Sequence, residues 1–140
     1  MASVKGVNFT NITADPVVNA DSGEWSGKLR VQFDTFEASS LASGSDISVA
    51  RLPKGAKVYD VAIHHDALGS GVTLAVGDSA DADRYITATA AANAGVISMH
   101  NDGAIGGVGF EQTAETDILI TTGGAAATGT IKCMVFYVVE

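Results

Sequence analysis

The stretch GVTLAVGDSADADRYI, residues 71–86, carries the pattern that predicts the fold. Val72, Leu74 and Val76 recur at every second position, which places them on one face of a β-strand. A small acidic turn follows, and a second strand is expected after it. Short alternating segments of the same kind, bounded by Gly, Asp, Ser or Pro, recur before and after this stretch. The stretch therefore predicts one hairpin of an antiparallel β-structure.

The composition also favours strands over helices. The chain has 140 residues, of which 46% are apolar, 17% are charged and 16 are glycines. This length suits a single domain, and alanine, glycine, valine and threonine in such numbers suit short strands and tight loops. We expect an all-β fold, an antiparallel β-sandwich or jelly roll over residues 28–140. Its strands are expected at residues 28–36, 47–52, 56–65, 72–76, 85–89, 96–99, 108–112, 117–122 and 130–139.

Several strands carry more specific expectations. Leu29, Val31 and Phe33 alternate with polar residues, which predicts that they face the core while the polar residues face solvent. Residues 38–45 are expected to form a loop, and residues 108–112 and 117–122 a hairpin. In the strand 56–65, one face is expected to carry Tyr59, Val61 and Ile63, and the other Val58 and Ala62.

The closing strand, residues 130–139, is apolar on both of its alternating faces. Such a strand is either central in a sandwich or part of a subunit interface. One face carries Ile131, Cys133, Val135 and Tyr137, and Cys133 is expected to be a small buried hydrophobe. For the opposite face we predict self-association through Met134, Phe136 and Val138.

The first 27 residues lack sustained periodicity and contain several turn residues. They predict an extended N-terminal arm, with a disordered terminus as the alternative. The arm is favoured because a solvated tail would carry fewer apolar residues. We expect it to order against a neighbouring subunit or partner through Val4, Val7, Phe9, Ile12, Val17 and Val18.

The charge balance limits the partners. A net charge of −8, with only eight scattered Lys and Arg residues, argues against nucleic acid. No apolar run is long enough to span a bilayer and no secretory leader is evident, so no membrane partner is expected. We expect the protein to be made in a reducing cytosol.

Three aspartates in the stretch quoted above, Asp78, Asp81 and Asp83, suggest either a calcium site or a turn. Clustered carboxylates suit a hard cation, but the spacing lacks the central Gly and terminal Glu of an EF-hand. Aspartate also favours turns through local hydrogen bonds. We favour a turn in which Asp81 or Asp83 pairs with Arg84, and expect no metal.

The remaining residues do not indicate an enzyme. His64 and His65 are adjacent in a strand and should point to opposite faces, and His100 is distant in sequence. No nucleophile elbow or phosphate loop appears. We therefore expect no catalytic residue, no cofactor and no metal. The alternative enzyme would be a small cupin-like protein with a metal on these histidines.

Three segments occur in a distinctive order: the strand at residues 47–53, which leads into Pro-Lys-Gly-Ala-Lys-Val, LAVGDSADADRYI at residues 74–86, and Gly-Thr-Ile-Lys at residues 129–132 before an apolar and aromatic strand. In these segments and their order, the chain resembles small head-decoration (capsid cement) proteins of tailed bacteriophages. The resemblance spans residues 28–139, and its motifs consist of strand and turn residues.

This resemblance implies a jelly-roll homotrimer on the outer surface of the virion, where it clamps neighbouring copies of the major capsid protein and stabilises the head. The six apolar arm residues would then contact the capsid, and the host bacterial cytoplasm would be the place of synthesis. The alternative is a phage tail or fibre β-domain that binds host glycan through the aspartates, with Trp25 and Tyr85 as stacking platforms.

Overall fold

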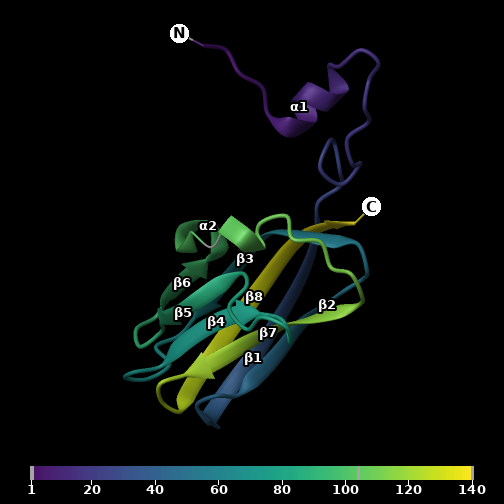
Figure 1. Ribbon diagram of the computed structural model, residues 1–140. Coiled ribbons are helices and arrows are strands. Elements are labelled where there is room, and N and C mark those ends of the chain that lie inside the picture. The colour runs from purple at the N-terminus through teal and green to yellow at the C-terminus, as the bar shows by residue number, and fades with distance from the viewer. Residues whose placement is uncertain (1, 104, 140) are drawn as a thin grey trace.

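The computed structural model describes residues 2–103 and 105–139, which fold into two packed four-stranded sheets with an N-terminal segment outside them (Figure 1). The elements are α1 (Val7–Ile12), β1 (Arg30–Leu41), β2 (Asp46–Leu52), β3 (Ala56–His65), β4 (Thr73–Gly77), β5 (Ile86–Ala90), β6 (Gly95–Ser98), α2 (Met99–Asp102), the 3-10 helix η1 (Ile105–Gly107), β7 (Thr116–Gly123) and β8 (Ala127–Val139).

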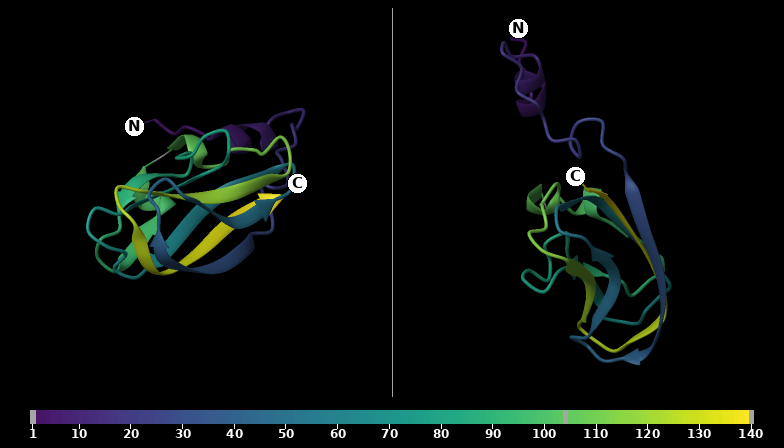
Figure 2. Two further views of the ribbon diagram at one scale, coloured as in Figure 1. Left: turned by 90° about the horizontal axis from the view of Figure 1, so that it is seen from below. Right: turned by 90° about the vertical axis from the view of Figure 1, so that its right-hand side faces the viewer.

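The first sheet has the order β1-β8-β3-β6 and the second has the order β2-β7-β4-β5. Every strand pair within them is antiparallel. Figure 2 shows the two sheets facing each other as layers. The predicted all-β antiparallel sandwich is confirmed.

One hydrophobic core fills the space between the sheets. Alternation along the strands supplies it, as the almost complete burial of Leu74 and Val76 on β4 and of Ile118 and Ile120 on β7 shows. Cys133 on β8 lies in the same core, and burial raises the pKa of its thiol to about 12. The prediction of a small buried hydrophobe at this position is confirmed.

The predicted hairpin between residues 108–112 and 117–122 is wrong. β7 pairs with β2 and β4, whereas residues 108–112 make a single isolated bridge, from Glu111 to Lys57. The glycines explain the error: Gly107 ends η1, and Gly109 has a φ of +74°, which a strand does not accept. The loop predicted at residues 38–45 is also shorter, because β1 continues to Leu41.

A β-bulge changes the predicted faces of β3. Val58 pairs with Tyr137 and Asp60 with Phe136, so Tyr59 is the extra residue between them. Beyond the bulge the alternation restarts in the opposite phase. Val58 is therefore buried on the same face as Val61 and Ile63, and the placement of Tyr59 with these two residues was wrong.

The first half of β1 faces the opposite way from its prediction. Val31 and Phe33 are 55% and 59% exposed, and they lie beside β8 residues on the outer face of the first sheet. Gln32 takes the inward position, where its amide donates to the Arg51 carbonyl (2.8 Å) and accepts from the Arg51 N–H (2.9 Å). These bonds join the edge strands of the two sheets, and they hold the polar residue inside.

The N-terminal segment, residues 2–27, leaves the sandwich at the end where β8 finishes (Figures 1 and 2). It contains one short helix, α1, which the sequence did not predict and which has no buried residue. Residues 21–26 form a compact turn against the first sheet, and we call this turn the root of the segment.

Candidate interaction surfaces

The acidic turn between β4 and β5 is held by one buried carboxylate. Asp78 is 3% exposed and accepts from the N–H groups of Ala80 and Asp81, each at 3.0 Å, and from Arg84 Nε at 2.8 Å. The ion pair with Arg84 is thus made by Asp78, not by Asp81 or Asp83 as predicted. The Arg84 guanidinium also stacks on the Phe110 ring, 3.8 Å from its centroid.

Two further contacts show how this turn joins the core. Burial alone would raise the pKa of Asp78, but hydrogen bonds from Arg84, from the backbone of Asp81 and from Gln112 lower it. Gln112 also donates to the Tyr85 hydroxyl at 2.6 Å. The three aspartates therefore differ in position: Asp78 is the buried centre of the turn, and Asp81 and Asp83 are exposed.

Tyr85 cannot serve as a stacking platform for a glycan. Its side chain is fully buried, and burial raises the pKa of its hydroxyl to about 12. Trp25, the other residue expected to stack on sugar, is 43% exposed and lies far along the chain in the root of the N-terminal segment. The aromatic pair of the glycan-binding alternative is therefore not formed.

The histidines are separated. His64 is exposed on the outer face of the first sheet, and His65 is buried with its Nδ1 2.8 Å from the Asp66 carbonyl oxygen. This agrees with the prediction that the two point to opposite faces. His100 lies near Asp60, with 3.6 Å between Nδ1 and Oδ2. Over residues 2–103 and 105–139, no three His, Cys, Asp or Glu side chains are grouped as metal ligands.

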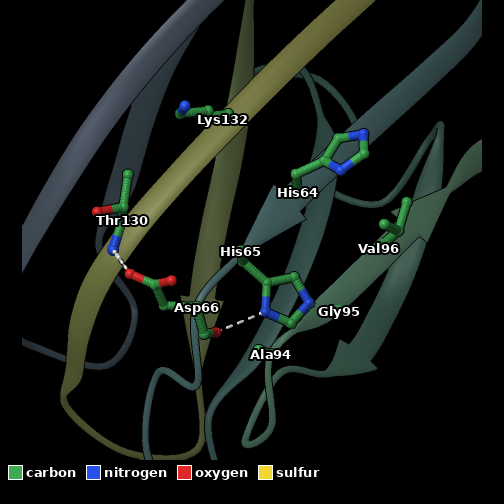
Figure 3. A pocket seen from close by; sticks show the side chains of 8 residues that line it. All are labelled: His64, His65, Asp66, Ala94, Gly95, Val96, Thr130 and Lys132. Atoms are coloured by element: carbon green, nitrogen blue, oxygen red, sulfur yellow. Dashed lines mark hydrogen bonds between the residues drawn. The ribbon is translucent and has the colours of Figure 1, made fainter.

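A shallow hollow lies where β3 ends beside β6 and β8 (Figure 3). In Figure 3 the His64 and His65 rings are on different sides of the strand, and the Asp66 carboxylate accepts from the Thr130 N–H at 3.0 Å. The hollow is otherwise lined by Ala94, Gly95, Val96 and Lys132. The Asp66 carboxylate accepts from a backbone N–H, and the His65 ring contacts a backbone carbonyl. Both side chains therefore stabilise the ends of the strands.

An apolar surface covers part of the outer face of the first sheet. It consists of Val31, Phe33, Met134 and Phe136, which we call the outer apolar patch. Strand pairing places Val31 beside Phe136 and Phe33 beside Met134. The two β8 residues are half-buried and the two β1 residues are exposed. Because the β1 residues were expected in the core, the sequence indicated only the β8 half of this patch.

Val138, the third residue predicted for self-association, does not contribute to this surface. It is 3% exposed. In the register of β3 and β8 it lies opposite Lys57, whose ammonium contacts Asp21 and Glu24 of the root. The root of the N-terminal segment thus covers this end of the face.

A second apolar surface lies on the N-terminal segment itself. Val4 and Val7 are 88% and 80% exposed. Phe9, Val17 and Val18 are also exposed, and Ile12 is half-buried. Five of the six apolar residues predicted for the arm are therefore exposed on the described segment, residues 2–27.

These features define a β-sandwich with two exposed apolar surfaces. No helix in the described part of the chain is both long and apolar enough to cross a bilayer. The chain matches no protein-family model and no curated protein.

Its fold, however, recurs in three phage structures. It resembles a chain in the capsid asymmetric unit of cyanophage Pam1, with a TM-score of 0.66 and 24% identity over 87% of this chain and 90% of that one. For the capsid of Ralstonia phage GP4 the TM-score is 0.65, with 18% identity over 81% and 86% of the two chains. For the acidic stable capsid of Helicobacter pylori bacteriophage KHP30 it is 0.59, with 12% identity over 81% and 90%.

Proposed function

We propose that this protein is a structural virion protein, a decoration or cement protein that binds the outer surface of a phage head and stabilises it. The observation that carries the proposal is the combination of a fold found in three phage capsid structures with an N-terminal segment that displays apolar side chains away from the sandwich. The strand order β1-β8-β3-β6 facing β2-β7-β4-β5 supports a jelly roll, since all consecutive strands except the β4–β5 hairpin lie in opposite sheets, as in two Greek keys.

The acidic surface supports an outer location. A chain with a net charge of −8 is repelled by packaged nucleic acid and is better suited to the outside of the head. No residue group described above forms a nucleophile with its base, so the role we propose is structural and not enzymatic. The partner is the major capsid protein, and assembly onto the head follows synthesis in the bacterial cytoplasm.

The N-terminal segment supplies the capsid contact in this proposal. Each fully buried Val or Phe side chain contributes about 1.5–3 kcal/mol, so five contribute roughly 7–15 kcal/mol before any cost is subtracted. Association costs about 4–15 kcal/mol in lost freedom of motion. Because these two ranges nearly cancel, a single segment would bind weakly.

A homotrimer would overcome this weakness. Once one segment of a trimer is bound, the other two bind at a high effective concentration, which strengthens attachment without new contacts. We propose that the outer apolar patch forms the surface between subunits, through Val31, Phe33, Met134 and Phe136. Phe33→Ser together with Phe136→Ser should then shift the protein to monomers in sedimentation velocity. If the unsubstituted protein is monomeric at micromolar concentration, the trimer is excluded.

The capsid contact is tested by binding to heads that lack decoration. Full-length protein is compared with a chain that begins at residue 19, which keeps Asp21 and Glu24 of the root, and with Val7→Ser/Phe9→Ser. The matched control is Val96→Ser/Val108→Ser, which removes two exposed apolar residues from outside the N-terminal segment. Co-sedimentation and copy number on the head are the readouts.

The expected result is retained binding for the control and at least about a tenfold weaker binding for the other two, because each buried apolar side chain contributes over 1 kcal/mol. Undecorated heads should also release their contents at a lower temperature than decorated ones. Equal binding by the shortened chain would overturn the role of the segment, and no binding by the full-length protein would overturn the proposed function.

A further inference from the structure

We infer that Lys57 is an electrostatic anchor that holds the N-terminal segment in one direction relative to the sandwich. The Lys57 side chain is 5% exposed, although it lies on the outer face of the first sheet. Its ammonium is 2.9 Å from Asp21 Oδ2 and 2.7 Å from Glu24 Oε1. The root itself covers the ammonium, so the two ion pairs and the burial of Lys57 exist only when the root is in place.

The root is shaped to present both carboxylates to one ammonium. The N–H groups of Glu24 and Trp25 both donate to the Asp21 carbonyl, at 3.0 and 2.9 Å, which closes the turn. Gly27 packs so tightly on the carbonyl of Gly23 that a Cβ would lie 2.7 Å from that oxygen. The Tyr59 hydroxyl donates to the same Gly23 carbonyl at 3.1 Å, so the bulge of β3 adds a second attachment point.

The anchor extends to the helix. Asn8 Nδ2 on α1 donates to Glu24 Oε2 at 2.7 Å, while the other oxygen of the same carboxylate faces Lys57. Farther out, the Val18 N–H donates to the Asn11 carbonyl at 3.0 Å and folds the segment back on α1. A continuous series of hydrogen bonds therefore joins β3 to the root and the root to the helix that carries Val7 and Phe9.

The consequence is a segment that is ordered before it meets a partner. An ordered segment avoids much of the ordering cost that a flexible tail incurs on binding. This inference does not depend on the proposed function, because it concerns the free protein. Under the proposed function, Lys57 would be a positioning residue for the capsid contact.

The free protein provides its own probe, since Trp25 is the only tryptophan and lies next to Glu24. Lys57→Met removes the ammonium and keeps the length of the side chain. Lys54→Met is the matched control, because Lys54 is exposed in the turn before β3 and the charge change is the same. Asp21→Asn/Glu24→Gln removes the carboxylates without a change in either sheet. Trp25 fluorescence anisotropy and tryptic cleavage after Lys28 are measured, with circular dichroism as the check on folding.

We expect lower Trp25 anisotropy and about fivefold or faster cleavage after Lys28 in Lys57→Met and in the double variant, with wild-type behaviour in the control, because proteolysis follows the population of the opened form. A Lys57→Met protein that matches the control in both readouts would overturn the anchor. If Lys57→Met does not fold, the Asp21→Asn/Glu24→Gln variant alone tests the anchor, and wild-type behaviour of that variant would overturn it. If the protein does not bind capsids but Trp25 anisotropy changes as expected in the variants, only the proposed function is refuted.

Discussion

The contacts of Asp78 predict a stability effect that a cation site would not produce. Asp78→Asn keeps the size of the side chain and one oxygen that can accept the turn N–H groups. It removes the charge that faces Arg84, whose Nε is 2.8 Å away. Because the Arg84 side chain is only 16% exposed, the guanidinium is then left largely buried without its counter-charge.

The size of the effect follows from this burial. Removal of one partner from a buried ion pair costs about 3–5 kcal/mol. Partial exposure of Arg84 and the oxygen that asparagine retains reduce this, so we expect a loss of about 2–3 kcal/mol in the free energy of unfolding. With an unfolding entropy of about 2.1 cal/mol/K per residue over 140 residues, Tm falls by about 7–10 °C.

Thermal unfolding of the three single variants separates the turn from a cation site. Asp81→Asn and Asp83→Asn should each change the free energy of unfolding by less than about 0.5 kcal/mol, since both side chains are exposed. Each variant is measured with calcium and with a chelator. The reasoning would be refuted by three similar losses of stability together with a calcium-dependent rise in the Tm of the unsubstituted protein.

Three further outcomes are expected. Gly77→Ala should destabilise the protein by at least about 2 kcal/mol in urea unfolding, because its Cβ would lie 2.1 Å from the Asp81 carbonyl oxygen; wild-type stability would show that the turn can shift freely. The pKa of Asp78 is lowered in the folded chain. The contribution of Asp78 to the free energy of unfolding is therefore complete above its ordinary pKa of 3.8 and is lost as the pH falls through the lowered value. The stability difference between wild type and Asp78→Asn should therefore shrink in acid titrations below about pH 4, and a difference that stays constant would contradict this. Cys133 should react with a thiol reagent only on unfolding, because burial raises its pKa to about 12; rapid labelling of the native protein would show that β8 opens.

Alternation of apolar residues was sufficient to predict the class of fold and most of the strands. β3 has the predicted bounds, and β2 and β4 differ from theirs by only one or two residues. The turn at Asp78 was predicted as a turn because its residue types act locally. Its specific ion pair was not, because Asp78, Asp81 and Asp83 are equivalent as carboxylates until burial distinguishes them.

The errors arise where distant residues decide the outcome. Nothing within β1 shows that Gln32 will bond to the backbone of Arg51, which is 19 positions away, and this bond turns Val31 and Phe33 outward. The alternation in β1 therefore predicted that its apolar face packs against the core, whereas in the structure that face is exposed to solvent. The bulge at Tyr59 likewise depends on the register with β8.

The candidate surfaces were predicted unevenly for the same reason. Met134 and Phe136 could be identified because β8 is apolar on both faces. The burial of Val138 could not, because it depends on where the root of the N-terminal segment lies. The exposed apolar residues of that segment were identified from composition, whereas its helix and its contact with Lys57 depend on tertiary packing.

The arrangement of the two ends of the sandwich has a practical consequence. β1 begins and β8 finishes at the end from which the N-terminal segment leaves, while the loops after β1, β3 and β7 lie at the opposite end (Figure 1). On a head bound through the N-terminal segment, a peptide fused after β8 would face the shell. One inserted into the exposed loop at residues 42–44 would point into the medium. That loop, and not the end of β8, is the place to graft an epitope for multivalent display.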